Sequence, residues 1–182
     1  MSTYTDRPDL SKELDEKLAW QPGTGNARTI ALIGLGGTGK SQLALRFIER
    51  HEAEYDTILW IDVRDEETAR SSFARCCRAL GLPVERRRSL GLQAEPSFEE
   101  EPLQDVPHVQ AVLDSLRARA EHEKWLAVID NADDLSWDVS NIIPRGKAGT
   151  VMVTSQDARA SRLLGGRTPT VKVDAMHPEE AV

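Results

Sequence analysis

Five short apolar runs, separated by longer amphipathic segments, constrain the fold of this chain more than any other feature. Several runs are apolar at consecutive positions, which is typical of parallel strands covered on both faces. The segments between them place apolar residues at helical spacing. Strands that alternate with helices predict an α/β fold with a doubly wound parallel sheet. The expected strands are 29–33, 57–62, 125–130, 150–155 and 170–173, and the expected helices are 10–18, 41–52, 66–80, 109–121 and 157–164.

A glycine-rich loop, GLGGTGKS, joins the first expected strand to the helix that follows it. Gly34, Gly39, Lys40 and Ser41 occupy the fixed positions of the phosphate-binding pattern G-x-x-x-x-G-K-[ST]. Glycines let backbone N–H groups converge on phosphate oxygens, and the helix start adds unpaired N–H groups and a partial positive charge. Lys40 is expected to reach the β- and γ-phosphates, and Ser41 to bind Mg²⁺. The alternative interpretation is a glycine-rich turn between strand and helix.

A nucleoside triphosphatase of this kind also needs an acid at the end of another strand to hold Mg²⁺. The run WLAVID ends in Asp130, which is therefore predicted to be the second magnesium ligand. The alternative is that Asp130 caps a turn. Asp133 and Asp134, which follow shortly after, are expected to cap the next turn rather than to bind metal.

Composition excludes several functional classes. The net charge of −7 argues against non-specific binding of nucleic acid or of anionic membranes. No apolar stretch approaches the roughly 18 residues of a membrane span, and the polar N-terminal stretch is not a signal peptide. The only cysteines, Cys76 and Cys77, are adjacent, which disfavours a disulfide between them. We therefore expect reduced cysteines and a cytoplasmic protein.

Three parts are expected along the chain. Residues 1–28 form an N-terminal helical lead-in, 29–176 a nucleotide-binding domain, and 177–182 the start of a further helix. Within the domain, residues 83–107 carry four prolines and blocks of like charge, which predict an exposed loop or disorder. An alternative function for this segment is an anion or partner site at Arg86, Arg87 and Arg88.

Four segments together resemble the NB-ARC nucleotide-binding domains of fungal-type NOD-like receptors, which are STAND-class P-loop NTPases. In chain order they are GLGGTGKSQLAL, YDTILWIDV, KWLAVIDNADD and IIPRGKAGTVMVTSQD. The resemblance implies a three-layer P-loop NTPase sandwich with a five-stranded parallel sheet. It also implies that the strand ending in Thr154 and Ser155 lies between the two expected strands that end in an acidic residue, 57–62 and 125–130.

The same resemblance implies a signal-transduction switch of innate immunity with an ADP-bound resting state and an ATP-bound active state. The active full-length protein would form a homo-oligomer, and effector, helical, winged-helix and repeat domains would be the module's partners within the same protein. Adenine is favoured as the base on this resemblance alone, because no guanine-selecting Asn-Lys-x-Asp pattern is present.

The resemblance also assigns roles to individual residues. The stretch YTDRPDL would place Arg7 beside the nucleotide base. The catalytic group would be Lys40, Asp130 and Asn131, and the metal ligands would be Ser41 and Asp130. Nucleotide-binding residues would be Arg7, Gly34, Gly36, Gly37, Thr38, Gly39, Lys40, Ser41, Gln42 and Gln156.

Two departures from the family pattern bear on hydrolysis. Asn131 stands where the family often has a second acid, and an amide can orient a water molecule but cannot accept its proton. Gln156 stands where an arginine usually detects the γ-phosphate, and Arg159 and Arg162 are candidates to compensate. We therefore expect a nucleotide-binding regulatory switch with weak or absent ATP hydrolysis. The alternatives are an active metabolic NTPase or kinase, and an assembly scaffold without nucleotide turnover.

Overall fold

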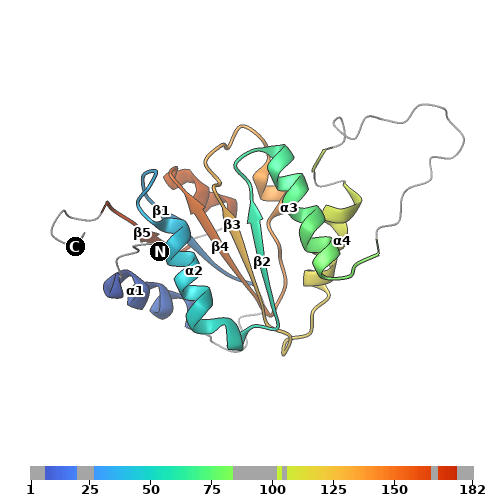
Figure 1. The fold of residues 1–182 in the computed structure, drawn as a ribbon, viewed down its shortest axis with the longest axis horizontal. Helices are drawn as coiled ribbons and strands as arrows, with labels where there is room; N and C mark the ends of the chain where they lie inside the picture. The colour runs from blue at the N-terminus through green and yellow to red at the C-terminus, as the bar shows by residue number, and fades with distance from the viewer. Residues whose placement is uncertain (1–6, 20–26, 84–101, 104–105, 165–167, 176–182) are drawn as a thin grey trace, which may run out of the picture.

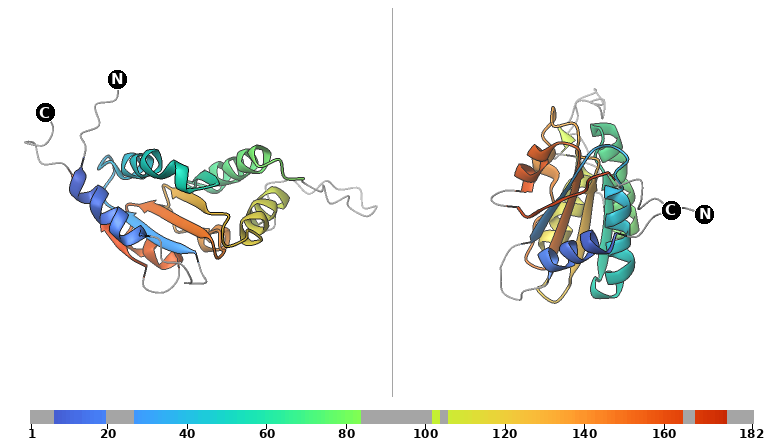
Figure 2. Two further views of the ribbon diagram at one scale, coloured as in Figure 1. Left: turned by 90° about the horizontal axis from the view of Figure 1, so that it is seen from below. Right: turned by 90° about the vertical axis from the view of Figure 1, so that its left-hand side faces the viewer.

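A computed structural model describes residues 7–19, 27–83, 102–103, 106–164 and 168–175. Helices lie on both sides of a central sheet (Figure 1, Figure 2). The α-helices are α1 (Pro8–Leu18), α2 (Lys40–His51), α3 (Glu66–Ala79) and α4 (Pro107–Arg117). The strands are β1 (Arg28–Ile33), β2 (Thr57–Asp62), β3 (Trp125–Asp130), β4 (Gly149–Ser155) and β5 (Thr170–Lys172). The 3-10 helices with bounds among the described residues are η1 (Glu52–Glu54), η3 (Val139–Ile142) and η4 (Ala158–Leu164).

The five strands form one parallel sheet in the order β2-β3-β4-β1-β5. The predicted α/β class, with its five-stranded parallel sheet, is confirmed. The expectation that β4 lies between two acid-bearing strands is wrong. β4 lies between β3 and β1, while the strands that end in Asp62 and Asp130 are direct neighbours. The crossover through α2 carries the chain to the sheet edge at β2, and β3 and β4 then fill the space between β2 and β1.

The sheet separates two apolar clusters. On one face, α1 and α2 pack against Ile30, Leu32 and Met152. On the other face, α3, α4, η3 and η4 pack against Trp125, Ile129 and other strand residues. Because β3 and β4 are buried at every position, their near-continuous apolar sequences follow from coverage on both faces.

Two sequence predictions need correction. Residues 158–164, expected within an α-helix, form the 3-10 helix η4. The segment 83–107 is not wholly an exposed loop, because Leu103 and Val106 are 3% and 1% exposed and belong to the core. Its last residue, Pro107, starts α4 at a position where the missing N–H of proline is tolerated. Residues 84–101 and 177–182, and with them Arg86, Arg87 and Arg88, lie outside the described residues.

Cys76 and Cys77 are free and buried on α3, as expected for reduced cysteines. Burial raises the pKa of both thiols. Among the described residues, no helix is long and apolar enough to cross a membrane.

Candidate functional site: a phosphate loop beside two strand-end carboxylates

The glycine-rich loop lies between the end of β1 and the start of α2, at the carboxyl edge of the sheet. Gly37 and Gly39 adopt left-handed backbone angles, with φ of 77° and 90°, and Gly39 is the N-cap of α2. Side chains rarely tolerate this conformation, so glycine is needed where the loop turns into the helix. The first turn of α2 therefore faces the loop with N–H groups that have no partner within the helix, the arrangement that favours an anion at a helix start.

Gly34 is required for a different reason, the close approach of the backbone that follows β5. A Cβ atom on Gly34 would lie 2.0 Å from the carbonyl oxygen of Val173 and 3.0 Å from Thr38 Oγ1. The Val173 amide in turn donates to Ile33 O at 2.7 Å. The start of the loop is thus fixed against the segment after β5.

Lys40, the first residue of α2, reaches back across the loop. Its Nζ donates to Gly34 O at 2.8 Å and to Leu35 O at 2.9 Å. The ammonium group is therefore held against the start of the loop, and the contact with phosphates that the pattern assigns to it stays a prediction.

Ser41 and Asp130 come together although 89 positions separate them in the sequence. Ser41 Oγ donates to Asp130 Oδ1 at 2.8 Å, and Thr154 Oγ1 donates to the same oxygen at 2.5 Å. Asp130 is only 6% exposed, and within the described part of the chain it forms no ion pair. A buried carboxylate beside a hydroxyl is a suitable partial ligand set for Mg²⁺, which completes its octahedron with phosphate oxygens and water. Among the described residues, no group of three or more His, Cys, Asp or Glu side chains is placed to hold a metal ion.

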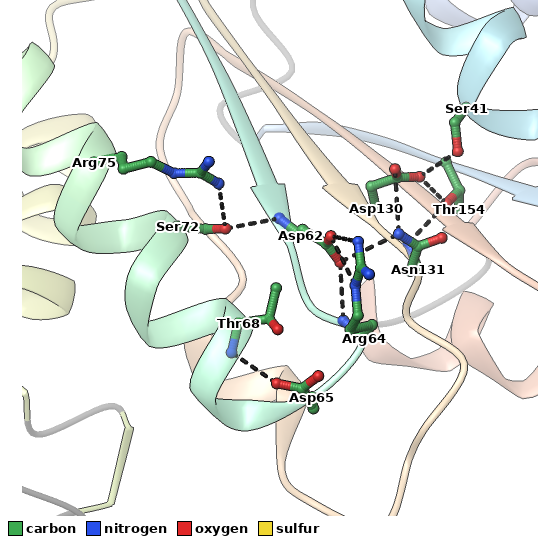
Figure 3. Close-up of polar contacts among 10 residues, drawn as sticks. All are labelled: Ser41, Asp62, Arg64, Asp65, Thr68, Ser72, Arg75, Asp130, Asn131 and Thr154. Carbon is green, nitrogen blue, oxygen red and sulfur yellow. Dashed lines mark hydrogen bonds and ion pairs between the residues drawn. The ribbon is translucent and has the colours of Figure 1, made fainter.

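Asn131 follows Asp130 with a left-handed φ of 62°, a conformation that asparagine tolerates better than most residues. Its backbone N–H donates to Thr154 Oγ1 at 3.0 Å. Its Nδ2 donates to Asp62 Oδ1 at 3.2 Å and to Asp130 Oδ2 at 3.4 Å (Figure 3). The Asn131 amide therefore lies between two carboxylates.

Asp62, which ends β2, also pairs with Arg64. Arg64 donates to Asp62 Oδ2 through Nε at 2.9 Å and through its terminal NH2 group, and its backbone N–H donates to Oδ1 at 3.2 Å. Burial opposes ionisation of Asp62, but hydrogen bonds from Arg64 and Asn131 outweigh it and lower the pKa of this carboxyl. Asp62 is therefore a carboxylate at neutral pH.

Gln156 borders the loop but is held by Asp133. Its backbone N–H and its Nε2 donate to the two oxygens of Asp133 at 2.6 and 2.8 Å. A Cβ atom on Gly36 would lie 3.3 Å from Gln156 Oε1, which places the amide next to the loop. Asp133 thus holds the end of β4 instead of capping a turn, whereas Asp134 does cap one by accepting from Ser136 N at 2.8 Å.

The two arginines proposed to compensate for Gln156 differ in their surroundings. Arg159 pairs with Asp157 through Nε at 2.8 Å and through its terminal nitrogen at 2.6 Å. The Arg159 guanidinium is therefore bound to Asp157, two residues earlier in the same turn. Arg162 is exposed on η4.

Arg7 and Gln42 complete the set of predicted residues. Arg7 precedes α1 and donates to Asp174 O at 2.7 Å and to Thr38 O at 3.4 Å. It therefore lies between the glycine-rich loop and the segment after β5. Gln42 is exposed on the first turn of α2. Thr38 is buried and its Oγ1 donates to Leu35 O at 2.9 Å, which stabilises the loop from within.

Sequence reasoning missed Asp62, Arg64 and Thr154 as neighbours of Asp130. A signal for Asp62 was present, because the runs TILWID and WLAVID both end in Ile-Asp. Adjacent parallel strands with the same ending bring their last side chains to the same edge of a sheet. The order of the strands, which would have made the signal usable, was not readable from the sequence.

Comparisons with known proteins agree with the fold described above. A family model described as an AAA domain matches residues 24–156. A nucleotide-binding leucine-rich repeat (NLR)-like protein of Hyaloscypha variabilis is 21% identical over 158 residues, which cover 78% of this chain and 14% of that protein. Regulatory protein AfsR of Streptomyces coelicolor is 28% identical over an alignment of 194 residues, which covers 100% of this chain and 17% of that protein. The chain therefore spans less than a fifth of the length of either relative.

Among solved structures, the ORC2 protein of Aeropyrum pernix, determined as ADPNP and ADP complexes, matches with a TM-score of 0.52. The match covers 95% of this chain and 48% of that one, at 15% sequence identity. At this identity the match shows a common fold.

Proposed function

The chain belongs to the AAA domain family of P-loop NTPases, and we propose that it is an ADP- and ATP-binding regulatory switch with slow or absent intrinsic hydrolysis. More finely, we propose that it is the NB-ARC module of a cytoplasmic NOD-like receptor. The similarity to an NLR-like protein and to a regulatory protein supports this assignment. Effector, helical, winged-helix and repeat domains elsewhere in the full protein, and a homo-oligomer in its active state, belong to the same proposal.

The single observation that carries the proposal is the contact between Ser41 and Asp130 beneath the phosphate loop. Two residues far apart in the sequence form the hydroxyl–carboxylate pair that P-loop NTPases use to hold Mg²⁺. Bound Mg²⁺ would neutralise charge on the β- and γ-phosphates. Lys40 would contribute a positive charge to the same oxygens, and the N–H groups at the start of α2 would orient the phosphate chain. An assembly scaffold without nucleotide turnover would not require this arrangement of side chains.

A regulatory switch is favoured over a metabolic NTPase or kinase by the groups around the γ-phosphate position. Gln156 supplies a neutral amide, bound to Asp133, where a cation would stabilise developing charge. Arginines in that role contribute about 10³–10⁵ in rate in related enzymes. We therefore expect turnover well below the ~1 s⁻¹ at the low end of ordinary enzymes.

The direct test is to identify any nucleotide that the purified chain carries and to measure its affinity for ADP and ATP by calorimetry, with and without Mg²⁺. We expect an adenine nucleotide and Mg²⁺-dependent binding of ATP. Asp130→Asn keeps the shape of the side chain but removes its charge, so it should abolish most of the dependence on Mg²⁺. The absence of measurable binding of either nucleotide would overturn the proposal in favour of a scaffold.

Gln156→Arg should raise the affinity for ATP relative to ADP, because only ATP offers the charge of the γ-phosphate. Asp133, which already binds the Gln156 side chain, would hold the new guanidinium beside Gly36. A charge-assisted hydrogen bond of about 1.5–3 kcal/mol predicts a change of about tenfold or more in the affinity ratio.

Calorimetry with both nucleotides measures this ratio, and Gln110→Arg is the matched control. Gln110 is exposed on α4, so its replacement adds the same charge away from the loop. Equal ratios for the two variants would show that position 156 does not face the γ-phosphate.

A further inference from the structure

Asp62 lies at the border of the phosphate site, although the phosphate-binding pattern does not include it. The register of the parallel pair β2 and β3 places Asp62 directly beside Asp130, so both side chains leave the same edge of the sheet. The side chain of Asp62 is 15% exposed. Its carboxylate is therefore sheltered by protein while it retains some access to water.

The Asn131 amide fixes the arrangement of this cluster. Its NH2 group faces two carboxylates, Asp62 and Asp130, and the carbonyl oxygen of the same amide would be repelled by them. The orientation of the amide follows, with Nδ2 toward the carboxylates and Oδ1 directed elsewhere. An acid at position 131 would instead bring three negative groups into contact. Position 131 thus supplies a donor, and Asp62 is the carboxylate beside its amide that is not assigned to the magnesium site.

We propose that Asp62 is the general base of ATP hydrolysis at this site, the role that Asn131 cannot fill. This inference rests on the proposed function, since it requires ATP at the phosphate loop. In the step, a water oxygen forms a bond to the γ-phosphorus while Asp62 accepts one proton of that water. The bond between the γ-phosphorus and the bridging oxygen breaks, and its electron pair leaves with ADP. The proton then passes from Asp62 to the phosphate product, which restores the carboxylate.

Arg64 limits the base. Its guanidinium binds Asp62 through two nitrogens, which favours the ionised carboxylate and so makes it a weaker proton acceptor. The Arg64 side chain is 62% exposed, so its replacement should leave the packing around Asp62 unchanged. The expected slow turnover would then have a second cause beside the neutral amide of Gln156: the base is present on β2 but is paired with its counter-ion Arg64.

Asp62→Asn and Arg64→Gln test the assignment because they should act in opposite directions. We expect Asp62→Asn to lower single-turnover ATP hydrolysis by about 10²-fold or more, the usual contribution of a general base. Binding of Mg²⁺ and ATP, measured by calorimetry, should stay within about threefold, since Asp130 and Ser41 are unchanged. Arg64→Gln should raise hydrolysis severalfold, because release of the carboxylate raises its basicity.

Asp65→Asn is the matched control, with a readout of hydrolysis, nucleotide affinity and melting temperature. Asp65 is a carboxylate in the same turn, but it accepts from Thr68 N at 2.7 Å as the N-cap of α3 (Figure 3). Asparagine caps helices as well as aspartate does, so this variant should match the unmodified chain in all three measurements.

Each contrary outcome has a distinct meaning. Unchanged hydrolysis in Asp62→Asn, or no hydrolysis by the unmodified chain, would overturn the role of Asp62 and leave the proposed switch intact. An equal fall of hydrolysis in Asp62→Asn and Arg64→Gln would make the pair a structural element of the β2–α3 turn and also overturn it. If Asp62→Asn weakened Mg²⁺–ATP binding as much as Asp130→Asn, Asp62 would belong to the metal site and not be the base. Failure of the unmodified chain to bind ATP would overturn both proposals.

Discussion

Replacement of Lys40 by alanine is expected to weaken ATP binding by about ten- to a hundredfold. This range corresponds to the roughly 1.5–3 kcal/mol of a hydrogen bond that involves a charged group. The ammonium group is held over the loop by Gly34 O and Leu35 O, so it is positioned for phosphate oxygens before nucleotide arrives. Calorimetry with ATP and Mg²⁺ measures the loss. Affinity for ADP should fall less, because the substitution would remove only the contact of Lys40 with the β-phosphate.

The control for Lys40→Ala is Lys12→Ala, which removes the same charge from an exposed position on α1. The side chain of Lys12 is 78% exposed and pairs with Glu16 across one helical turn, at 3.9 Å. Such a pair contributes little, so nucleotide affinity should remain unchanged. Equal affinities of both variants for ATP would mean that the glycine-rich loop is a structural turn and not a phosphate site.

Gly149→Ala is expected to lower the free energy of unfolding by about 3 kcal/mol, at the upper end of the usual cost of overpacking. A Cβ atom on Gly149 would lie 2.0 Å from Trp125 Cζ2. Trp125 is fully buried, and β4 is an interior strand held on both sides, so neither can move away easily. For a chain of this size, the melting temperature should fall by about 6–12 °C. Urea denaturation gives the change in free energy directly.

A double-mutant cycle with Trp125→Leu separates this clash from a general effect of alanine in a strand. The smaller leucine leaves a cavity and destabilises the chain by itself, by an amount within the usual range for lost core volume. It also removes the ring atoms that meet the new methyl group. Gly149→Ala should therefore cost clearly less in the Trp125→Leu background. Additive effects of the two substitutions would contradict the contact as the cause.

The positions of the strands and helices were largely readable from the sequence because they depend on local patterns. All five strands lie where apolar runs occur. The helix α2 is shifted by one residue from the expected segment, and α3 ends one residue earlier than expected. Two exceptions do not follow from local patterns. Leu103 and Val106, in a segment rich in charge and proline, are buried because α3 and α4 leave apolar surface that they cover. Residues 158–164 adopt a 3-10 helix, which their spacing of apolar residues does not distinguish from an α-helix.

The phosphate loop was also determined by sequence, since its chemistry depends on residues that are close together in the chain. Gly37, Gly39, Lys40 and Ser41 form a strand–loop–helix unit whose geometry follows from left-handed glycines and the helix start. A local pattern of this kind predicts the residues and their positions at the same time. Asp130 was predictable for a related reason, because it ends a continuous apolar strand.

What only the tertiary structure decided is which strand ends are neighbours. The sequence shows two runs that end in Ile-Asp, and it shows Asn131 in place of an acid, but it does not give the order of the strands. The fold places β2 beside β3, so Asp62 lies next to Asp130 and the Asn131 amide lies between them. Strand order depends on how helices pack on the two faces of the sheet, a property of the whole domain. The joint role that we propose for residues 68 positions apart in the sequence is therefore contained in no local pattern.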